Sequence, residues 1–543
     1  MASYLVFVDT SGIQKYIFGS NRLRENIGAS YLVAAATDKW ANEAARKNAG
    51  EVVYAGGGNF VSLFQSQENA KAFTHQLSRK VLREAPGLQL RVKHIFVNDG
   101  DAIAAAVRDA IHELDRVGAG ELRSSQMMGL SITAVCRSTG LPAVGYINPK
   151  GENTDEGRYP ASAIVLAKAK PDVLKEANTE LEEQLELNLT NYTYPYDLDE
   201  LGRTEDEASY IAVVHADGNG VGTIIGKISD RYQNNSALNV EYKEVMHDLS
   251  EGLKAATQNA FMTVQRQLIE WINRGIATNK SGERLLKEIR GKYRGNRHIL
   301  PLRPVIIGGD DVTFVCDGSI GITLAVGFVR EFEKETQSLS EWLTSLLGES
   351  ISLSACAGVA IVKTHYPFAR AYSLSEELCK SAKSYRKQLE DIRKAKNPPD
   401  TTVGGCIDWH FATTGLSGNL KTIREREYGV RTGNLNLRPI TIETNTEHPL
   451  RSWDTVSELR EAFEDPDWAE KRSKIKALRD ALREGPDSVK RFSMIYGQIL
   501  PAMVSAPNIH QNGWEKYEVE PKKVQSFCAY FDAIELLDWY AEI

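Results

Sequence analysis

Three aspartates at two places in the sequence have the side chains and the setting for metal-ion chemistry. Asp217 follows one apolar run, and Asp310 and Asp311 lie between two others. Carboxylate oxygens gathered at one place are the hard ligands that Mg²⁺ and Mn²⁺ prefer. Two such ions bind a triphosphate, activate a ribose hydroxyl and stabilise the departing pyrophosphate. We therefore take Asp217, Asp310 and Asp311 as the candidate catalytic and metal-ligating residues.

The elements that must position these carboxylates are a strand and a hairpin. Residues 210–214 (YIAVV) predict a buried strand that ends just before Asp217. Residues 305–307 and 312–315 are apolar and flank a Gly-Gly-Asp-Asp turn, which is typical of a β-hairpin. If the hairpin lies beside the first strand, all three carboxylates converge on one edge of a sheet.

The two glycines of this turn, Gly308 and Gly309, fit the same interpretation. A hairpin tip without Cβ atoms lets the backbone approach a nucleotide and offers N–H donors to it. The tetrapeptide by itself is equally compatible with an ordinary surface turn. The flanking apolar runs, together with the preceding strand, favour the catalytic interpretation.

The order of these elements occurs twice in the chain. Residues 4–8 form an apolar run that ends at Asp9, and residues 52–64 predict a hairpin whose tip is Gly56-Gly57-Gly58-Asn59. Residues 131–135 and 352–362 predict a further strand in each half. Each half then ends in an Ala-Lys pair, at Lys168 and Lys383. An internal repeat of this kind indicates two related domains.

The sequence therefore predicts three domains and a linker. We expect the related domains at 1–190 and 209–395, joined by a polar linker at 191–208. Two consecutive prolines near residue 398 cannot continue a helix, and they mark the next boundary. Residues 396–543 are expected to be mainly helical, on the spacing of apolar residues in 452–495 and 516–541.

Composition narrows the class of protein. The chain has 543 residues, of which 42% are apolar and 25% charged, and this excludes a disordered or fibrous chain. A net charge of −7 argues against a surface devoted to nucleic acid. Six scattered cysteines without a CxxC pair fit neither a disulfide framework nor a four-cysteine zinc site. With no apolar run of the ~20 residues that a membrane helix needs, we expect a cytoplasmic protein without a membrane partner.

The second half resembles the palm domain of the polymerase–cyclase large subunit of type III CRISPR effector complexes, a relative of the GGDEF diguanylate cyclases. The segments that carry this resemblance are 216–222 (ADGNGVG), 307–311 (IGGDD), 354–361 (SACAGVAI) and 367–383. The first half resembles the degenerate first palm of that subunit, at 11–17, 22–32 and 54–60. Together these segments cover about 1–395.

The resemblance implies a fold and a reaction. The fold is α+β, with two ferredoxin-like palm domains and a helical C-terminal domain. The reaction is polymerisation of ATP and closure into cyclic oligoadenylate, with two Mg²⁺ or Mn²⁺ ions. Asp217 and Asp311 would be the principal metal ligands. Asp310 would assist as a ligand or position the substrate, and Gly218 could offer its carbonyl to metal. Lys383 would face phosphate, although a solvated surface lysine is the plainer alternative.

We expect the first palm to bind a nucleotide without catalysing a reaction. Asn59 stands where the second palm has Asp311, and one carboxylate cannot hold two divalent ions tightly. Bond formation needs two nucleotides, one attacking and one carrying the reactive triphosphate, so two palms would supply one pocket each. The residues expected to bind nucleotide in the first palm are Ser11, Gly56, Gly57, Gly58 and Asn59.

Two features of the family are expected to be missing. The sequence starts at the first palm strand, so the usual N-terminal HD nuclease and its DNA cleavage are not expected. His247-Asp248 spells the same pair, but it lies in a helix-like stretch without a nearby histidine. The zinc-binding cysteines often found between the palms are also absent.

A basic stretch between the first catalytic strand and the hairpin has two interpretations. It could hold triphosphates, RNA or a partner protein, or it could be a solvated helix face. Its basic residues are Lys280, Arg284, Lys287, Arg290, Lys292, Arg294, Arg297 and Arg303, against Glu283 and Glu288.

Three classes of function follow from the sequence. The first is a synthase of cyclic oligoadenylate, acting with guide and target RNA and other subunits of a type III-like complex, or as a free-standing defence enzyme. The second is a GGDEF-type cyclase that uses GTP. The third is a structural subunit without activity. The three aspartates argue against the third class, because an inactive palm has no need for them.

Overall fold

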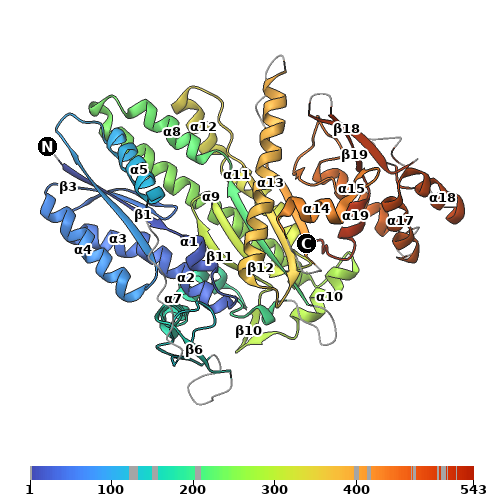
Figure 1. Ribbon diagram of the computed structural model, residues 1–543, viewed down its shortest axis with the longest axis horizontal. Coiled ribbons are helices and arrows are strands. Elements are labelled where there is room, and N and C mark those ends of the chain that lie inside the picture. The colour runs from blue at the N-terminus through green and yellow to red at the C-terminus, as the bar shows by residue number, and fades with distance from the viewer. Residues whose placement is uncertain are drawn as a thin grey trace.

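The computed structural model is an α+β protein built around two sheets of the same design (Figure 1). The N-terminal half and the C-terminal region lie at opposite ends of the molecule, with the larger sheet between them. The structure describes residues 3–120, 132–148, 157–201, 209–396, 403–412, 418–465, 468, 472–497, 500–502, 509, 512–520 and 523–543.

The first sheet has the order β2-β3-β1-β4, with all neighbours antiparallel. Its strands are β1 (Ser3–Ser11), β2 (Glu51–Gly56), β3 (Asn59–Phe64) and β4 (Gln89–Val97). Its helices are α1 (Ile13–Phe18), α2 (Leu23–Thr37), α3 (Lys39–Lys47) and α4 (Gln67–Glu84), followed by α5 (Ile103–Gly120). This order of elements, strand–helix–hairpin–helix–strand, is the ferredoxin-like arrangement that was expected.

The second sheet repeats this order as β11-β12-β8-β13 and continues with β14 and β17. Its strands are β8 (Tyr210–Gly218), β11 (Leu302–Gly308), β12 (Asp311–Asp317), β13 (Ala355–Lys363), β14 (Cys406–Ala412) and β17 (Ile440–Thr441). Its helices are α8 (Val221–Tyr232), α9 (Asn239–Arg274), α10 (Lys280–Ile289), α11 (Gly321–Glu335), α12 (Gln337–Leu347) and α13 (Phe368–Lys394). The duplication predicted from the sequence is therefore confirmed.

Each half covers one face of the other half's sheet. Side chains alternate between the two faces of a strand, so Leu5 and Phe7 of β1 point away from the first half's own helices α2–α4. These two residues share an apolar cluster with α5 and with α8 and α9 of the second half. In return, Ile211 and Val213 of β8 share a cluster with α2 of the first half and with α13.

The longest helix of the described residues, α9, joins the two sheets. Its N-terminal part contributes Tyr242 and Leu249 to the apolar cluster beneath the first sheet. Its C-terminal part contributes Phe261 and Leu268 to the cluster of α11 and the second sheet. At 36 residues and ~1.5 Å per residue, α9 is long enough to span both.

Two elements of the predicted repeat are wrong. Residues 132–135 form turns and an isolated bridge rather than a strand, and residue 131 lies outside the described residues. The fourth strand is β4, which sequence reasoning passed over because charged residues alternate with its apolar ones. Lys168 ends α6 (Ala163–Lys168), which packs against α2 rather than on the sheet, so it is not the counterpart of Lys383.

The elements between the two halves include one helix and several short strands, and these strands pair with one another or with strands of the second half. They are β5 (Gly145–Ile147), β6 (Tyr159–Ala161), α7 (Pro171–Gln184) and β7 (Tyr192–Thr193). Strand β7 pairs with β10 (Arg297–Ile299), which pairs with β9 (Tyr293–Arg294). The expected linker thus forms part of a small sheet with the basic stretch of the second half.

The C-terminal region contains the expected helices and also strands. The helices are α14 (Leu420–Tyr428), α15 (Trp453–Glu464), α17 (Arg472–Glu484), α18 (Pro486–Tyr496) and α19 (Phe531–Leu536). The strands are β15 (Gly429–Val430), β16 (Gly433–Asn434), β18 (Trp514–Glu520) and β19 (Lys523–Cys528). The helix expected over 516–541 is therefore wrong for its first half, where β18 and β19 pair as a hairpin. In addition, β14 pairs in parallel with β13 and extends the palm sheet.

All six cysteines are buried free thiols, as their scattered positions predicted. Among the described residues, no helix is both long and apolar enough to cross a membrane.

Candidate active site

The second sheet brings the three predicted aspartates together. Asp217 on β8 lies directly opposite Asp311 on β12 in the antiparallel register. Asp310 sits at the tip of the β11–β12 hairpin, next to Asp311, and its carbonyl accepts a 3.0 Å hydrogen bond from the N–H of Gly218. Gly309 has φ +58°, a backbone conformation that glycine adopts without strain. The predicted strand and hairpin therefore build the predicted cluster.

Burial, and then mutual repulsion, disfavours the ionised forms of the carboxylates in this cluster. Burial, and then the neighbouring charge of Asp217, raises the pKa of Asp310. Burial, Asp217 and Asp310 raise the pKa of Asp311 well above its usual range. The Asp311 side chain is 37% exposed. Its Oδ1 is buried and accepts no hydrogen bond within the described parts of the chain, but it lies 3.3 Å from Nδ1 of His215.

Lys383 of α13 neutralises part of this charge. Its Nζ donates to Asp217 Oδ2 and to the carbonyl of Gly218, each at 2.7 Å. Although burial disfavours the charged amine, the Asp217 carboxylate raises the pKa of Lys383. The sequence placed Lys383 near this edge, but its contacts are to a carboxylate and a carbonyl of the protein.

The donor set is suited to a hard divalent cation, but it is not gathered around a single point. In the described residues, no group of three His, Cys, Asp or Glu side chains is arranged to hold a metal ion. The fit rests on chemistry: a buried oxygen of Asp311 that accepts no hydrogen bond, beside two further carboxylates, is a donor set that Mg²⁺ or Mn²⁺ accepts. The ammonium of Lys383 now contacts two of the oxygens assigned to metal, those of Asp217 and Gly218.

The first sheet places its predicted residues in the same register with different charges. Asp9 on β1 lies opposite Asn59 on β3, as Asp217 lies opposite Asp311. On its other side Asp9 faces Arg91 of β4, where Asp217 faces Cys356 of β13.

Arg91 is a residue that the sequence analysis missed. Its Nη1 lies 4.0 Å from Asp9 Oδ2, and its Nη2 donates to Ser11 Oγ at 2.7 Å. The guanidinium therefore contacts Asp9 and Ser11 at the end of β1. Arg91 lies in a stretch where polar and apolar residues alternate, and this pattern could have predicted the strand β4. The neighbouring residues do not show that this strand pairs with β1.

Both hairpin tips open into one cavity of about 360 Å³ between the two halves. The first half contributes Asp9, Gly56, Gly57 and Asn59, and the second half contributes Gly309 and Asp310. The remaining wall comes from Asp115 on α5 and from apolar residues of α8 and α9, among them Val221, Ile225, Met246, Leu249 and Leu253. Seven predicted residues do not line this cavity: Ser11, Gly58, Asp217, Gly218, Gly308, Asp311 and Lys383.

A second cavity, of about 790 Å³, lies between α10 and the C-terminal helices α14, α17 and α19. None of the predicted site residues lines it, and its acidic and basic side chains are mixed, so its lining favours no ligand class.

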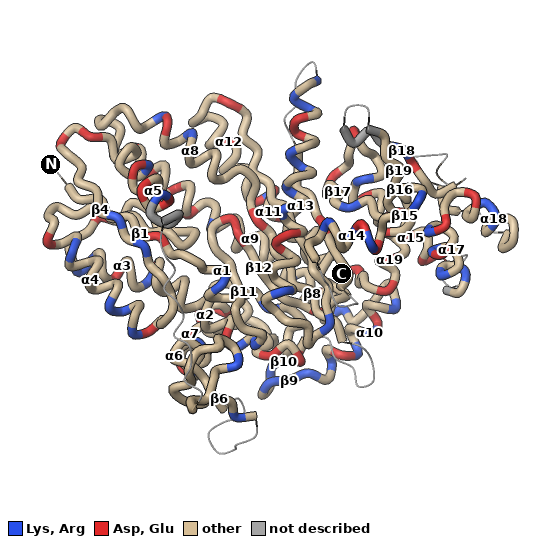
Figure 2. Tube along the Cα trace, in the orientation of Figure 1, with Lys and Arg blue, Asp and Glu red and all other residues tan. Residues whose placement is uncertain are grey.

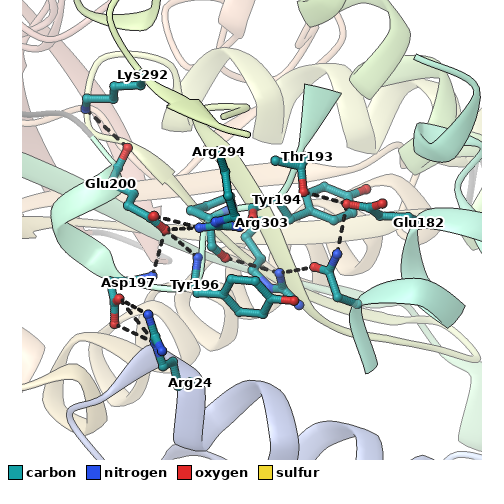
Figure 3. A network of polar contacts seen from close by, with 12 residues as sticks. Arg24, Glu182, Thr193, Tyr194, Tyr196, Asp197, Glu200, Lys292, Arg294 and Arg303 are labelled. Atoms are coloured by element: carbon teal, nitrogen blue, oxygen red, sulfur yellow. Dashed lines mark hydrogen bonds and ion pairs between the residues drawn. The ribbon is translucent and has the colours of Figure 1, made fainter. Parts of the chain in front are cut away.

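Several residues of the basic stretch make polar contacts within the protein. Arg294 donates to both carboxylate oxygens of Glu200, at 2.6 and 2.7 Å (Figure 3). Arg297 donates to Glu182 at 2.7 Å. Arg303 is buried beside the rings of Tyr194 and Tyr196. Basic and acidic residues accordingly lie side by side around β9 and β10 (Figure 2).

These contacts favour a structural role for much of this stretch. The Glu200, Tyr194 and Tyr196 partners belong to the linker between the palms, so the basic residues hold that linker against β9, β10 and β11.

His247 and Asp248 lie on exposed positions of α9, as the helical pattern predicted.

Part of the second half matches a known protein family. Residues 210–390 match the family model described as Cas10/Cmr2, second palm domain. This match confirms the resemblance to the large subunit that the second half carries in its sequence. A search of curated proteins found no match to the chain.

Solved structures with a similar arrangement include three of Csm1. The Csm1–Csm4 cassette in complex with cA4 is 12% identical and has a TM-score of 0.47, covering 98% of this chain and 69% of that chain. The cassette with AMPPNP is 13% identical with a TM-score of 0.47, at 99% and 69% coverage. Csm1 in T. onnurineus is 15% identical with a TM-score of 0.42, at 99% and 69% coverage.

Proposed function

We propose, from the match of residues 210–390 to the Cas10/Cmr2 second palm domain, that this chain is a nucleotidyltransferase that polymerises ATP and closes it into cyclic oligoadenylate. The observation that carries the proposal is the register of β8 and β12, which sets Asp217 against Asp311 with Asp310 at the adjoining tip. A carboxylate cluster of this kind, next to a cavity between two palms, suits a reaction on nucleoside triphosphates.

The aspartates would hold the metal ions. Asp217 and Asp311, with Asp310 and the Gly218 carbonyl, would ligate two Mg²⁺ or Mn²⁺ ions. These ions supply Lewis-acid stabilisation of the phosphates and of the departing pyrophosphate. Lys383 would turn from Asp217 to a phosphate oxygen of the bound nucleotide, which keeps its positive charge compensated. Gly308 and Gly309 would form the floor against which the nucleotide lies.

The first palm would bind the second nucleotide. Asp9, Gly56, Gly57 and Asn59 line the cavity that Asp310 and Gly309 also line, which supports one pocket shared by the two palms. With Asn59 and Arg91 where the second palm has Asp311 and Cys356, the first palm carries too little negative charge to hold two divalent ions. Two nucleotides held in one cavity would be aligned for bond formation.

The partners follow from the same resemblance. We propose that guide and target RNA and other subunits of a type III-like complex control the activity, because an unregulated second-messenger synthase would harm its cell. A free-standing synthase with a different trigger is the other form of this proposal.

The test is incubation of purified protein with labelled ATP or GTP and Mg²⁺, with and without a type III-like RNA-guided complex and target RNA, followed by mass analysis of products. Cyclic oligoadenylate from the wild type and none from Asp310→Ala/Asp311→Ala is the expected result. Products from GTP alone would indicate a GGDEF-type cyclase. No product under any condition would indicate a structural subunit. Full activity of the chain with nothing added would rule out control by a partner.

A further inference from the structure

Helix α9 forms a hydrogen bond with each of the two glycine hairpins. Ser250 Oγ donates to the carbonyl of Ala55 at 3.1 Å, one residue before the tip of the first palm. Thr257 Oγ1 donates to the carbonyl of Gly309, at the tip of the second palm. The two hydroxyls are seven residues apart, which is about two helical turns, so they lie on one side of α9 about 10 Å apart.

The fit between α9 and the tips is close. A Cβ at Gly56 would lie 2.9 Å from Ser250 Oγ, so the first tip reaches α9 because it has no side chain there. Thr257 has no exposed surface. Between and beside the two hydroxyls, Met246, Leu249 and Leu253 form the apolar wall of the shared cavity.

The packing of α9 against both sheets fixes the positions of Ser250 and Thr257 relative to the two tips. Its N-terminal part belongs to the apolar cluster of the first sheet and its C-terminal part to that of the second. A single rigid helix thus touches both tips and both sheets. Its hydroxyls act on backbone carbonyls rather than on any of the predicted metal ligands' carboxylates.

We infer that Ser250 and Thr257 are positioning residues that set the separation and orientation of the two glycine tips across the shared cavity. The inference rests on the proposed function, since the tips would carry the two nucleotides that react. Small displacements of reacting groups are costly, because a shift of about 1 Å can lower a rate by about 10²-fold. Loss of either hydroxyl would release one tip and misalign the pair.

The experiment removes each hydroxyl and restores it. Thr257→Val and Ser250→Ala should lower kcat for synthesis about tenfold, while the affinity of each variant for a non-hydrolysable ATP analogue changes less than about threefold. Thr257→Ser and Ser250→Thr keep the hydroxyl and should retain most of the activity.

A second measurement reports on the tips without any reaction. Amide hydrogen exchange of residues 54–60 should be faster in Ser250→Ala, and that of residues 307–312 faster in Thr257→Val. The matched controls are Thr336→Val, which removes a buried hydroxyl that donates to the Phe332 carbonyl at 2.8 Å, and Ser373→Ala on α13. Neither control should change exchange at the tips.

The outcomes separate the two proposals. A wild type that makes no product would overturn the proposed function, while the exchange data would still test the positioning role. Unchanged exchange at both tips, or a Thr257→Ser variant as impaired as Thr257→Val, would overturn the inference even if the wild type is active.

Discussion

Lys383 of α13 donates a 2.7 Å hydrogen bond to Asp217 of β8, so the carboxylate expected to ligate metal is already paired with a cation of the protein. The same ammonium donates to the Gly218 carbonyl, the other expected ligand on β8. A divalent ion that binds these oxygens must therefore compete with Lys383.

Replacing Lys383 with Met tests this competition. The variant should bind Mn²⁺ more tightly than the wild type in the absence of nucleotide, because Asp217 and Gly218 are no longer occupied by the amine. It should also bind ATP more weakly, since a positive charge near phosphate is lost. Titration of free Mn²⁺ by electron paramagnetic resonance measures the first effect. Lys380→Met, which removes an exposed lysine paired with Glu376 on the same helix, is the matched control. Weaker Mn²⁺ binding by Lys383→Met would contradict the competition.

Replacing both tip aspartates by alanine should abolish synthesis and leave the fold intact. Burial and mutual repulsion raise the pKa values of Asp310 and Asp311, so their ionised forms destabilise the metal-free protein. The double variant should therefore melt at a higher temperature than the wild type in a chelating buffer. Added Mg²⁺ should raise the melting temperature of the wild type but not that of the variant. Full product formation by the variant would refute the assignment of the active site.

Stability should depend on pH through Glu333 of α11. Burial raises the pKa of Glu333 from 4.5 to about 7, against the effect of the Gly405 N–H that it accepts. The folded chain then holds this proton more tightly than the unfolded chain, so the free energy of unfolding falls as pH rises from 4.5 through about 7.

Urea unfolding across this range gives the measurement. Glu333→Gln, whose amide oxygen can still accept from Gly405, should show a flatter dependence of the unfolding midpoint on pH. Glu335→Gln, on an exposed position of the same helix, should leave the dependence unchanged. A Glu333→Gln variant with the full wild-type slope would show that another group is responsible.

A bulky residue at Gly57 should block the first-palm side of the cavity. Gly57 lines the cavity, and a Cβ there meets open space, so the tryptophan of Gly57→Trp would project from the tip. Its φ of +59° also adds backbone strain to any substitution. Gly140→Trp shares a positive φ of +71° and open space but lies away from the cavity, which makes it the control for strain.

Two measurements test whether Gly57→Trp blocks the cavity: the number of ATP molecules bound per chain at equilibrium and the rate of synthesis. The wild type should bind two ATP molecules per chain, with one site requiring Asp311 and metal. Gly57→Trp should lose one of these sites and most of its synthesis, although every expected metal ligand is intact. A wild-type stoichiometry of one, or normal synthesis by Gly57→Trp, would argue against the shared pocket.

Restoring a carboxylate to the first palm should not create a second catalytic centre. In Asn59→Asp the new carboxylate would face Asp9, but Arg91 lies on the other side of Asp9 and compensates its charge. We expect no synthesis when Asn59→Asp is combined with Asp310→Ala/Asp311→Ala. Product from this combined variant would show that the first palm needs one more acid to react.

The sequence predicted those parts of the site that are written in adjacent residues. The strand before Asp217 and the hairpin around Asp310 each show a local pattern of apolar runs and glycines, and both are as expected. Arg91 and the contact of Lys383 with Asp217 depend on which distant elements pack together, and no local pattern encodes that choice. The same limit explains the misplaced fourth strand: residues 131–135 have the local pattern of a buried strand, whereas β4 carries Arg91 and Lys93 among its apolar residues.

Because each half buries apolar residues of the other half's sheet, neither half should fold stably without the other. If the chain were cut within the linker and residues 3–190 expressed alone, Leu5 and Phe7 would lose their contacts with α8 and α9 and keep only those with α5 on this face. The complementary fragment would expose Ile211 and Val213 where α2 lay. Buried apolar surface is worth about 25 cal/mol per Å², so the fragments should be aggregation-prone apart and recover a common fold when produced together. An ancestor with a single palm would have exposed the same apolar sheet face to water. Pairing with a second copy of itself is the simplest way for such a palm to bury that face.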